Sequence, residues 1–164
     1  MAPAELLDPQ PGERVLDLFE KTTGGRVILS VVKVGGVVRD IDASQMAEIV
    51  SVLDGIKGEY TQIMNTLLTD TSVKNRTVGV GHITTEDAAA LSMVGPFARA
   101  SNLPYDVRSF GRGAYGDLVD FAPITATEGD CYARVKVRCL EVLQSIEIIK
   151  ELGAKIPCLL YTSP

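Results

Sequence analysis

The side chains best suited to chemistry gather in one segment, residues 95–121, which reads GPFARASNLPYDVRSFGRGAYGDLVDF. It carries arginines, aspartates and tyrosines in close succession: Arg99, Arg108, Arg112, Asp106, Asp117, Asp120, Tyr105 and Tyr115. Buried Arg–Asp pairs lock a loop rigidly, and this is one interpretation of the pattern. In the other, the loop walls a cavity in which fixed cations and phenols tune charge. The residues themselves leave both interpretations open.

Metal ligation and thiol chemistry find little support elsewhere in the chain. The three cysteines, Cys131, Cys139 and Cys158, form no CxxC pair, and their odd number argues against a disulfide framework. Because free cysteines are among the most buried residues, we expect two core thiols and one tail thiol. His82 is the single histidine, and without clustered carboxylates it does not predict a metal site. We therefore predict no catalytic residue and no metal ligand in this chain.

Two long amphipathic helices are expected to position these residues, and the first begins near Asp42. Asp42 or Ser44 can cap its free amides. Gly55 and Gly58 lie inside it at a cost of about 1 kcal/mol each relative to alanine, which suggests a close helix crossing. Its apolar residues recur in steps of three and four: Met46, Ile49, Val50, Leu53, Ile56, Tyr60, Ile63, Met64, Leu67 and Leu68.

The second long helix is expected to begin after Asp130 and to end at Gly153, before the stop at Pro157. It shows one apolar stripe, formed by Val135, Cys139, Val142, Leu143, Ile146, Ile149 and Leu152. Each long helix needs a partner for its apolar face, so we expect the two to pack on each other and on helices beyond this chain.

Shorter elements fill the rest of the chain. Residues 13–25 read as a short helix that ends at a glycine cap, and residues 26–34 as a strand or a buried helix. Residues 69–82 read as a polar connection, residues 84–93 as a short helix capped by threonine, and residues 95–128 as mostly irregular. The predicted fold is mainly α (α+β): two long packed helices, short helices and one irregular loop, as part of a larger helical bundle.

Charge and hydropathy argue against nucleic-acid binding and against a membrane-spanning helix. The net charge of −5 gives no basic field that would favour nucleic acid. No uninterrupted apolar run approaches the roughly 18–20 residues of a membrane span. The sequence MAPAELLDPQ lacks the basic and apolar regions of a signal peptide, which predicts a cytoplasmic location.

Four ordered blocks resemble a known family. They are TTGGRVILSVVKVGGVVRDI (22–41), SVKNRTVGVGHITTEDA (72–88), VGPFARASNLPYDVR (94–108) and GDCYARVKVRCLEVLQSIEII (129–149). The chain is similar to the large subunits of membrane-bound, energy-converting (group 4) nickel–iron hydrogenases. These are homologous to the 49-kilodalton subunit of complex I, which is the D subunit of NADH-quinone oxidoreductase. The first block resembles the hydrogenase branch more closely, so we predict a fragment of an energy-converting hydrogenase subunit, with the quinone-binding subunit of complex I as the alternative.

The resemblance implies a redox subunit of a complex attached to the cytoplasmic face of the membrane. Its partners would be an iron–sulfur small subunit and a membrane arm that moves ions. In the hydrogenase branch the full-length subunit binds a nickel–iron centre that interconverts protons and hydrogen. In the complex I branch the corresponding cavity binds quinone, in an enzyme that also binds NAD. A helical interaction module without catalytic function remains as another hypothesis.

This chain departs from the hydrogenase pattern, because neither CxxC motif of that branch is present. The histidine and tyrosine that contact quinone in complex I also have no counterpart here. We therefore expect an internal fragment, 13–157, that binds no cofactor and is inactive alone. Residues 1–12 would be an irregular lead-in, and residues 158–164 a non-native tail. Within the fragment, the resemblance suggests six residues near the redox or quinone cavity: Gly95, Pro96, Arg99, Ser101, Asp106 and Arg108. Arg99 and Arg108 would supply fixed positive charge, and Asp106 would orient one of them.

Overall fold

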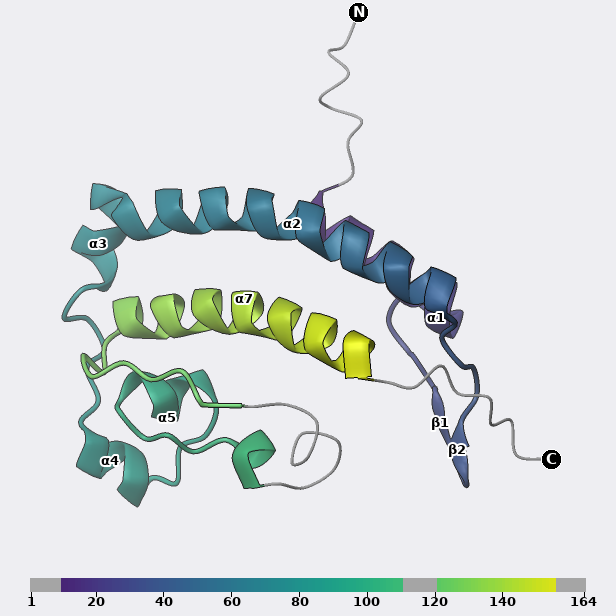
Figure 1. Ribbon diagram of the computed structural model, residues 1–164. Coiled ribbons are helices and arrows are strands. Elements are labelled where there is room, and N and C mark those ends of the chain that lie inside the picture. The colour runs from purple at the N-terminus through teal and green to yellow at the C-terminus, as the bar shows by residue number, and fades with distance from the viewer. Residues whose placement is uncertain (1–9, 111–120, 156–164) are drawn as a thin grey trace, which may run out of the picture. The chain divides into compact units, whose positions relative to one another are not determined.

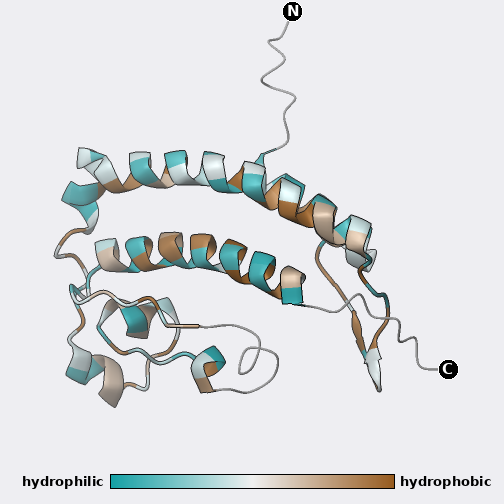
Figure 2. Cartoon of the chain, in the orientation of Figure 1, coloured by the Kyte–Doolittle hydropathy of each residue, from teal (hydrophilic) through white to brown (hydrophobic). Residues whose placement is uncertain are grey.

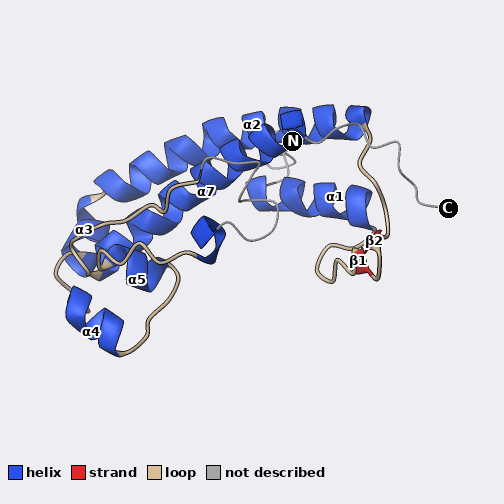
Figure 3. Ribbon diagram, turned by 60° about the horizontal axis from the view of Figure 1, so that its bottom comes forward, coloured by secondary structure: helices blue, strands red, loops and turns tan. Residues whose placement is uncertain are grey.

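A computed structural model describes residues 10–110 and 121–155 of the chain. These residues fall into two compact units, one within residues 1–60 and one within residues 61–155. Helices dominate both, and a single two-stranded hairpin is the described sheet (Figures 1 and 3). The elements are α1 (Pro11–Thr23), β1 (Val32–Lys33), β2 (Gly36–Val37), α2 (Ala43–Thr69), α3 (Thr71–Thr77), α4 (Thr85–Ala90), α5 (Pro96–Ala100), η2 (Val107–Phe110) and α7 (Cys131–Lys155). The predicted mainly α class is confirmed.

In the first unit, α1 begins at Pro11, two residues before the predicted start. Proline suits the first turn, where its missing N–H is not needed. The helix ends at Gly24, which takes the left-handed conformation at φ 84° and donates its amide to the carbonyl of Glu20. Arg14 of α1 forms an ion pair with Glu59, and Lys21 forms one with Glu48, so charged pairs join α1 to α2.

The segment that the sequence left as strand or buried helix is a short exposed hairpin. Val32 pairs with Val37 and Lys33 with Gly36, across a tight turn at Val34 and Gly35. Glycine takes the positive φ of 89° that this turn requires at position 35. The hairpin carries hydrophobic residues, as the brown colour of its strand shows (Figure 2). Its valines are nevertheless exposed, with Val32 at 82%, so burial was the wrong part of that prediction.

Helix α2 begins at a reciprocal cap. The carboxylate of Asp42 accepts from the amide of Gln45 at 2.8 Å, and the side chain of Gln45 accepts from the amide of Asp42 at 3.0 Å. Asp42 is therefore the cap, and Ser44 lies within the helix. A close crossing was predicted at Gly55 and Gly58. A Cβ at Gly58 would meet nothing within 4 Å, and one at Gly55 would meet only Nη1 of Arg14, at 3.8 Å, so neither glycine is required by a tight contact among the described residues.

The second unit contains a helix that the sequence did not predict. Residues 71–77 form α3 where a polar connection was expected. The carboxylate of Asp70 caps α3 by accepting the amide of Val73 at 2.8 Å. The helix shows no buried residue of its own, so its sequence carries no apolar stripe to reveal it. The predicted cap of the next helix is confirmed, because the hydroxyl of Thr84 accepts the amide of Asp87 at the start of α4.

Helix α7 is the centre of the second unit, where it packs against α5 and α3. Its buried core with neighbouring elements consists of Ala100, Ala126, Ala133 and Val137. The predicted stripe was partly wrong. Cys139 and Ile146 are buried as expected, but Val142 and Ile149 are exposed.

The buried face of α7 instead includes Ala133, Arg134 and Val137, and Ala133 and Val137 cluster with Ala100 of α5. The helix also continues through Gly153 to Lys155, so the predicted glycine cap is wrong. One hydrogen bond joins the two long helices at one end, from the hydroxyl of Tyr132 to the carbonyl of Leu68 at 2.8 Å. Among the described residues, α7 packs mainly on α5 and α3, so the predicted packing of the long helices on each other stays a prediction. Within the described ranges, no helix has the length and apolar character needed to cross a bilayer.

Candidate functional site

The site is built on α5, a helix of one and a half turns inside the segment that was expected to be irregular. Gly95 precedes it with φ 68°, a conformation that glycine adopts without strain. Pro96 follows at the first helical position, where its fixed φ fits. The carbonyl of Gly95 accepts the amide of Arg99 at 3.1 Å. Gly95 and Pro96 therefore start the helix that holds the backbone of Arg99 in place.

Arg99 is the buried hub of the site, with only 7% of its side chain exposed. Its Nε lies 2.5 Å from the carboxylate of Glu141 on α7. Its Nη1 lies 3.0 Å from the carboxylate of Asp106 and 3.2 Å from the carbonyl oxygen of Tyr105. One guanidinium therefore joins α5, α7 and the chain after α5, as a planar fork with several donors can.

Asp106 links Arg99 to Arg108. Arg108 donates from Nε at 3.0 Å, from Nη2 at 2.8 Å and from its backbone amide at 3.0 Å. The hydrogen bond from the Arg108 side chain lowers the pKa of Asp106 below its ordinary value. Burial opposes this, while the amide of Arg108 and the charges of Arg108 and Arg99 add to it. The guanidinium of Arg108 also stacks over the ring of Phe121 at 4.4 Å.

The cluster of Arg99, Asp106, Arg108 and Glu141, called the ion cluster below, contains two cations and two anions. Burying such groups is unfavourable unless they are paired and hydrogen-bonded, and each carboxylate here accepts from a guanidinium. The predicted Arg–Asp lock is therefore present in the structure. Among these four side chains, two positive charges face two negative charges.

Ser101 ends α5 and anchors it to a neighbouring segment. Its side chain is almost fully buried, and its hydroxyl donates to the carbonyl of Ile83 at 3.0 Å. The backbone on either side is paired as well, since Ala126 donates to Arg99 and Gly129 donates to Ala100, both at 2.9 Å. Ser101 thus serves the packing of α5 in this structure.

A second polar network lies at the start of α7 and was not predicted beyond its cap. Asp130 accepts the amide of Ala133 at 2.8 Å and the amide of Gly79 at 2.7 Å. Burial raises the pKa of Asp130, but hydrogen bonds from the amides of Ala133, Gly79 and Tyr132, with the charge of Arg134, outweigh it. The net pKa of Asp130 is lowered.

Arg134 completes this second network. Its guanidinium donates to the carbonyl of Gly81 and, at 3.0 Å, to that of Gly129. It also stacks over the ring of Phe97 at 4.4 Å. These contacts join α5, α7 and the glycine-containing segment before α4.

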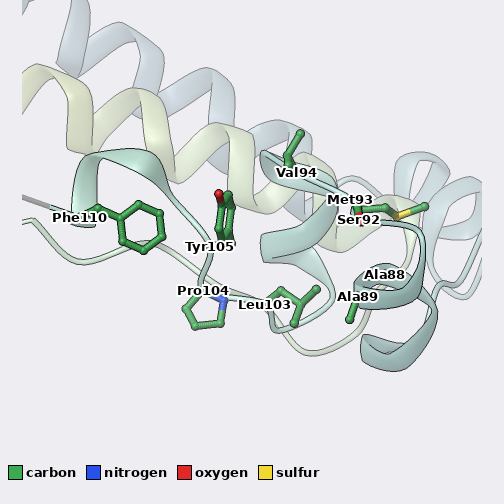
Figure 4. Close-up of a pocket in the computed structure, with 9 residues that line it drawn as sticks. All are labelled: Ala88, Ala89, Ser92, Met93, Val94, Leu103, Pro104, Tyr105 and Phe110. Atoms are coloured by element: carbon green, nitrogen blue, oxygen red, sulfur yellow. The ribbon is translucent and has the colours of Figure 1, made fainter. Parts of the chain in front are cut away.

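An apolar pocket of about 560 Å³ is lined in part by Tyr105, whose backbone carbonyl binds Arg99 of the ion cluster (Figure 4). Tyr105 and Phe110 form one end of it, and α4 with the turn after it forms the other. The two rings meet edge to face with centroids 5.4 Å apart. Its lining is Ala88, Ala89, Ser92, Met93, Val94, Leu103, Pro104, Tyr105 and Phe110.

The six predicted residues are not all in one place. The structure brings Arg99, Asp106 and Arg108 together in the ion cluster, with Gly95 and Pro96 at the start of the supporting helix. None of the six lines the pocket, although Asp106 directly follows its Tyr105. Glu141 was missed, because it lies 42 residues from Arg99 in sequence and reads as an ordinary polar position of an amphipathic helix. Arg112, Tyr115, Asp117, Asp120 and Cys158 lie outside the described residues.

The described residues do not suit a nickel–iron centre. Across residues 10–110 and 121–155, no group of three or more His, Cys, Asp or Glu side chains could hold a metal ion. Cys139 is a buried core thiol, as expected. Cys131 is half-buried, with its sulfur 3.6 Å from Nη1 of Arg134. No chemical step through a metal can be assigned to these side chains.

Comparison with known proteins decides the family. Residues 9–162 match the family described as respiratory-chain NADH dehydrogenase, 49 Kd subunit. The chain belongs to this 49-kilodalton subunit family. The family resemblance inferred from the four sequence blocks is thereby confirmed.

Relatives of this 49-kilodalton-family chain come from several respiratory systems. It is 39% identical over 150 residues to the C/D subunit of NADH-quinone oxidoreductase from Bacteroides thetaiotaomicron, a match that covers 88% of this chain and 27% of the relative. It is 36% identical over 146 residues to the D subunit of F(420)H(2) dehydrogenase from Methanosarcina mazei, covering 88% of this chain and 39% of that protein.

A solved structure agrees with these relatives. A chain of the membrane-bound sulfane sulfur reductase, an archaeal respiratory membrane complex, matches with a TM-score of 0.81 and 32% identity. The match covers 93% of this chain and 40% of that one. The chain thus spans between 27% and 40% of the length of these relatives. It is related to subunits of multi-subunit respiratory oxidoreductases.

Proposed function

We propose that this chain forms part of the quinone-site subunit of a complex I-like oxidoreductase, peripheral to a membrane on its cytoplasmic face. The observation that carries the proposal is the match of 88% of the chain, at 39% identity, to a relative named as an NADH-quinone oxidoreductase subunit. The full-length subunit would act beside an iron–sulfur subunit and a membrane arm. NAD would be used elsewhere in such an enzyme, since no nucleotide loop is recognisable in this sequence.

Within that subunit, the ion cluster would hold one wall of the cavity in a fixed shape. Its paired charges support this role more than a role in proton transfer, because each carboxylate is held by a guanidinium. The neighbouring apolar pocket fits the quinone class in size and lining, since ligand pockets commonly have volumes of about 300–1,000 Å³ and few polar groups. The chain's own residues would bind and orient the acceptor, and the acceptor would supply the redox chemistry.

A second candidate is the hydrogenase branch, favoured by the resemblance of residues 22–41 to that branch. In it, the full-length subunit would hold a nickel–iron centre with cysteines that this chain does not contain. Recovering the full-length gene separates the two candidates. Two CxxC motifs and hydrogen-dependent activity support the hydrogenase branch. A quinone-type histidine with quinone-dependent NADH or F420H2 oxidation supports the proposal.

Substitution of Arg99 tests the cavity role in the intact complex. Arg99→Ala should reduce turnover with a short-chain quinone while the complex still assembles. Arg26→Ala provides a control, because Arg26 is an arginine of the first unit that pairs with exposed carboxylates of α1. If Arg99→Ala changed assembly or stability but not turnover per assembled complex, the chain would act as a helical interaction module, and the cavity role would be wrong.

A further inference from the structure

We propose that Glu141 is a positioning residue: through Arg99, it sets the aromatic end of the pocket formed by Tyr105 and Phe110. The structural part of this inference depends only on the contacts that join these four residues. Its consequence for turnover rests on the proposed function.

Glu141 is a fixed point on the long helix. Its carboxylate is 16% exposed and accepts from Nε of Arg99 at 2.5 Å. The backbone carbonyl of Glu141 accepts the hydroxyl of Ser145 at 2.7 Å, within the regular turns of α7. A carboxylate held on a 25-residue helix moves less than one held on a loop. Glu141 can therefore act as the reference to which the shorter elements are aligned.

Arg99 links Glu141 to the backbone of Tyr105 and to Asp106. The guanidinium is planar, so fixing its Nε edge also fixes the direction of its Nη atoms. Nη1 points to the carbonyl oxygen of Tyr105 at 3.2 Å and to the carboxylate of Asp106 at 3.0 Å. Rotation of the guanidinium away from Glu141 would therefore release the backbone of Tyr105 as well as the ion pair with Asp106.

Tyr105 connects Arg99 to the pocket, because its carbonyl binds Arg99 and its ring lines the pocket. Tyr105 is 53% exposed as a residue, and its ring lies against Phe110 with an interplanar angle of 65° (Figure 4). Both rings form the same end of the pocket, opposite α4. Because an edge-to-face contact depends on ring orientation, a small backbone shift at Tyr105 changes the pocket at the place where a flat ring would rest. Glu141, which lies outside the pocket lining, is thus connected through Arg99 to Tyr105 and Phe110, which are part of the lining.

Fluorine NMR of the full chain labelled with 3-fluorotyrosine tests the positioning. The variant Tyr105→Phe assigns the Tyr105 resonance. Glu141→Gln keeps an acceptor oxygen but removes the charge, and Glu141→Ala removes both. We expect the Tyr105 resonance to shift in Glu141→Gln and to shift further or broaden in Glu141→Ala. Glu151→Gln is the matched control, because Glu151 lies on the same helix and pairs with Lys155 at the surface. That control should leave the Tyr105 resonance in place.

Kinetics of the full-length subunit in its complex test the consequence. Glu141→Gln should raise the KM for a short-chain quinone roughly tenfold, equivalent to about 1.4 kcal/mol, the size of one weakened charge-assisted hydrogen bond. The kcat should change by less than about threefold, since Glu141 acts through binding geometry and touches no reacting atom. Glu151→Gln should behave as the wild type.

The two experiments separate the two ideas. If the wild-type complex reduces no quinone, the proposed function fails, while the NMR result still decides the positioning role. If the Tyr105 resonance stays in place in both Glu141 variants, or moves equally in Glu151→Gln, the positioning role is overturned. A lower kcat with an unchanged KM in Glu141→Gln also overturns it. If Glu141→Ala does not fold, the Gln variant carries the test.

Discussion

Removal of the Asp130 carboxylate should destabilise the second unit more than removal of a simple helix cap. Asp130→Ala deletes two acceptors at once. The lost cap of α7 costs about 1 kcal/mol. The amide of Gly79, which donates to Asp130 at 2.7 Å in a half-buried setting, loses its partner and adds about 1–3 kcal/mol. The expected loss in the free energy of unfolding is therefore about 2–4 kcal/mol.

Asp70→Ala is the matched control, because Asp70 caps α3 through a single exposed bond to the amide of Val73. It should cost about 1 kcal/mol or less. Urea unfolding of the full chain, followed by far-ultraviolet circular dichroism, measures both variants. Hydrogen exchange adds a local readout, since the Gly79 amide should lose its protection in Asp130→Ala but keep it in Asp70→Ala. Equal losses in the two variants, with unchanged protection of Gly79, would refute the double role of Asp130.

Three further predictions concern packing, backbone conformation and pH. Val137→Ala should lower the free energy of unfolding by about 1–3 kcal/mol, whereas the exposed Val142→Ala should change it by less than about 0.5 kcal/mol; urea unfolding of both variants checks which face of α7 is buried. Gly129→Ala should strongly lower the melting temperature, because glycine holds φ 64° there and a Cβ would lie 2.3 Å from the carbonyl oxygen of Ile83. Gly58→Ala should raise the melting temperature, because a Cβ there meets nothing within 4 Å and alanine favours the helix. The lowered pKa of Asp106 means that its contribution to stability is complete above its unfolded pKa of about 3.9 and is lost as pH falls through the lower folded pKa; acid titration of Asp106→Asn should show a shallower loss of stability than the wild type.

The sequence predicts the parts of this structure whose signals are local. Asp42, Thr84 and Asp130 were recognised as caps because a side-chain oxygen reaches an amide only three residues away. Gly24 was recognised because a left-handed residue ends many helices. The Arg–Asp lock was one of two interpretations because its members are close in the chain.

Features that depend on distant partners were not predictable in the same way. Helix α3 contains Val73 as its one apolar residue, so no periodicity marks it. The buried face of α7 depends on Ala100 of α5 and on Ala126, which cluster with Ala133 and Val137. Glu141 pairs with Arg99 on another element, and no sequence pattern within α7 predicts that partner. The hairpin was ambiguous because a short apolar run fits a strand or a helix equally well.

The start of α7 also determines when the second unit can fold during synthesis. Asp130 accepts the amide of Gly79 across 51 positions, and Arg134 donates to the carbonyl of Gly81 across 53. A ribosome adds about 5–20 residues per second, so the glycine segment and α5 wait for several seconds before these partners emerge. During that interval their polar groups are paired with water and their small apolar faces are uncovered. The second unit is therefore expected to form in one late step, when the first turns of α7 leave the ribosome, and not to grow helix by helix from its N-terminal side.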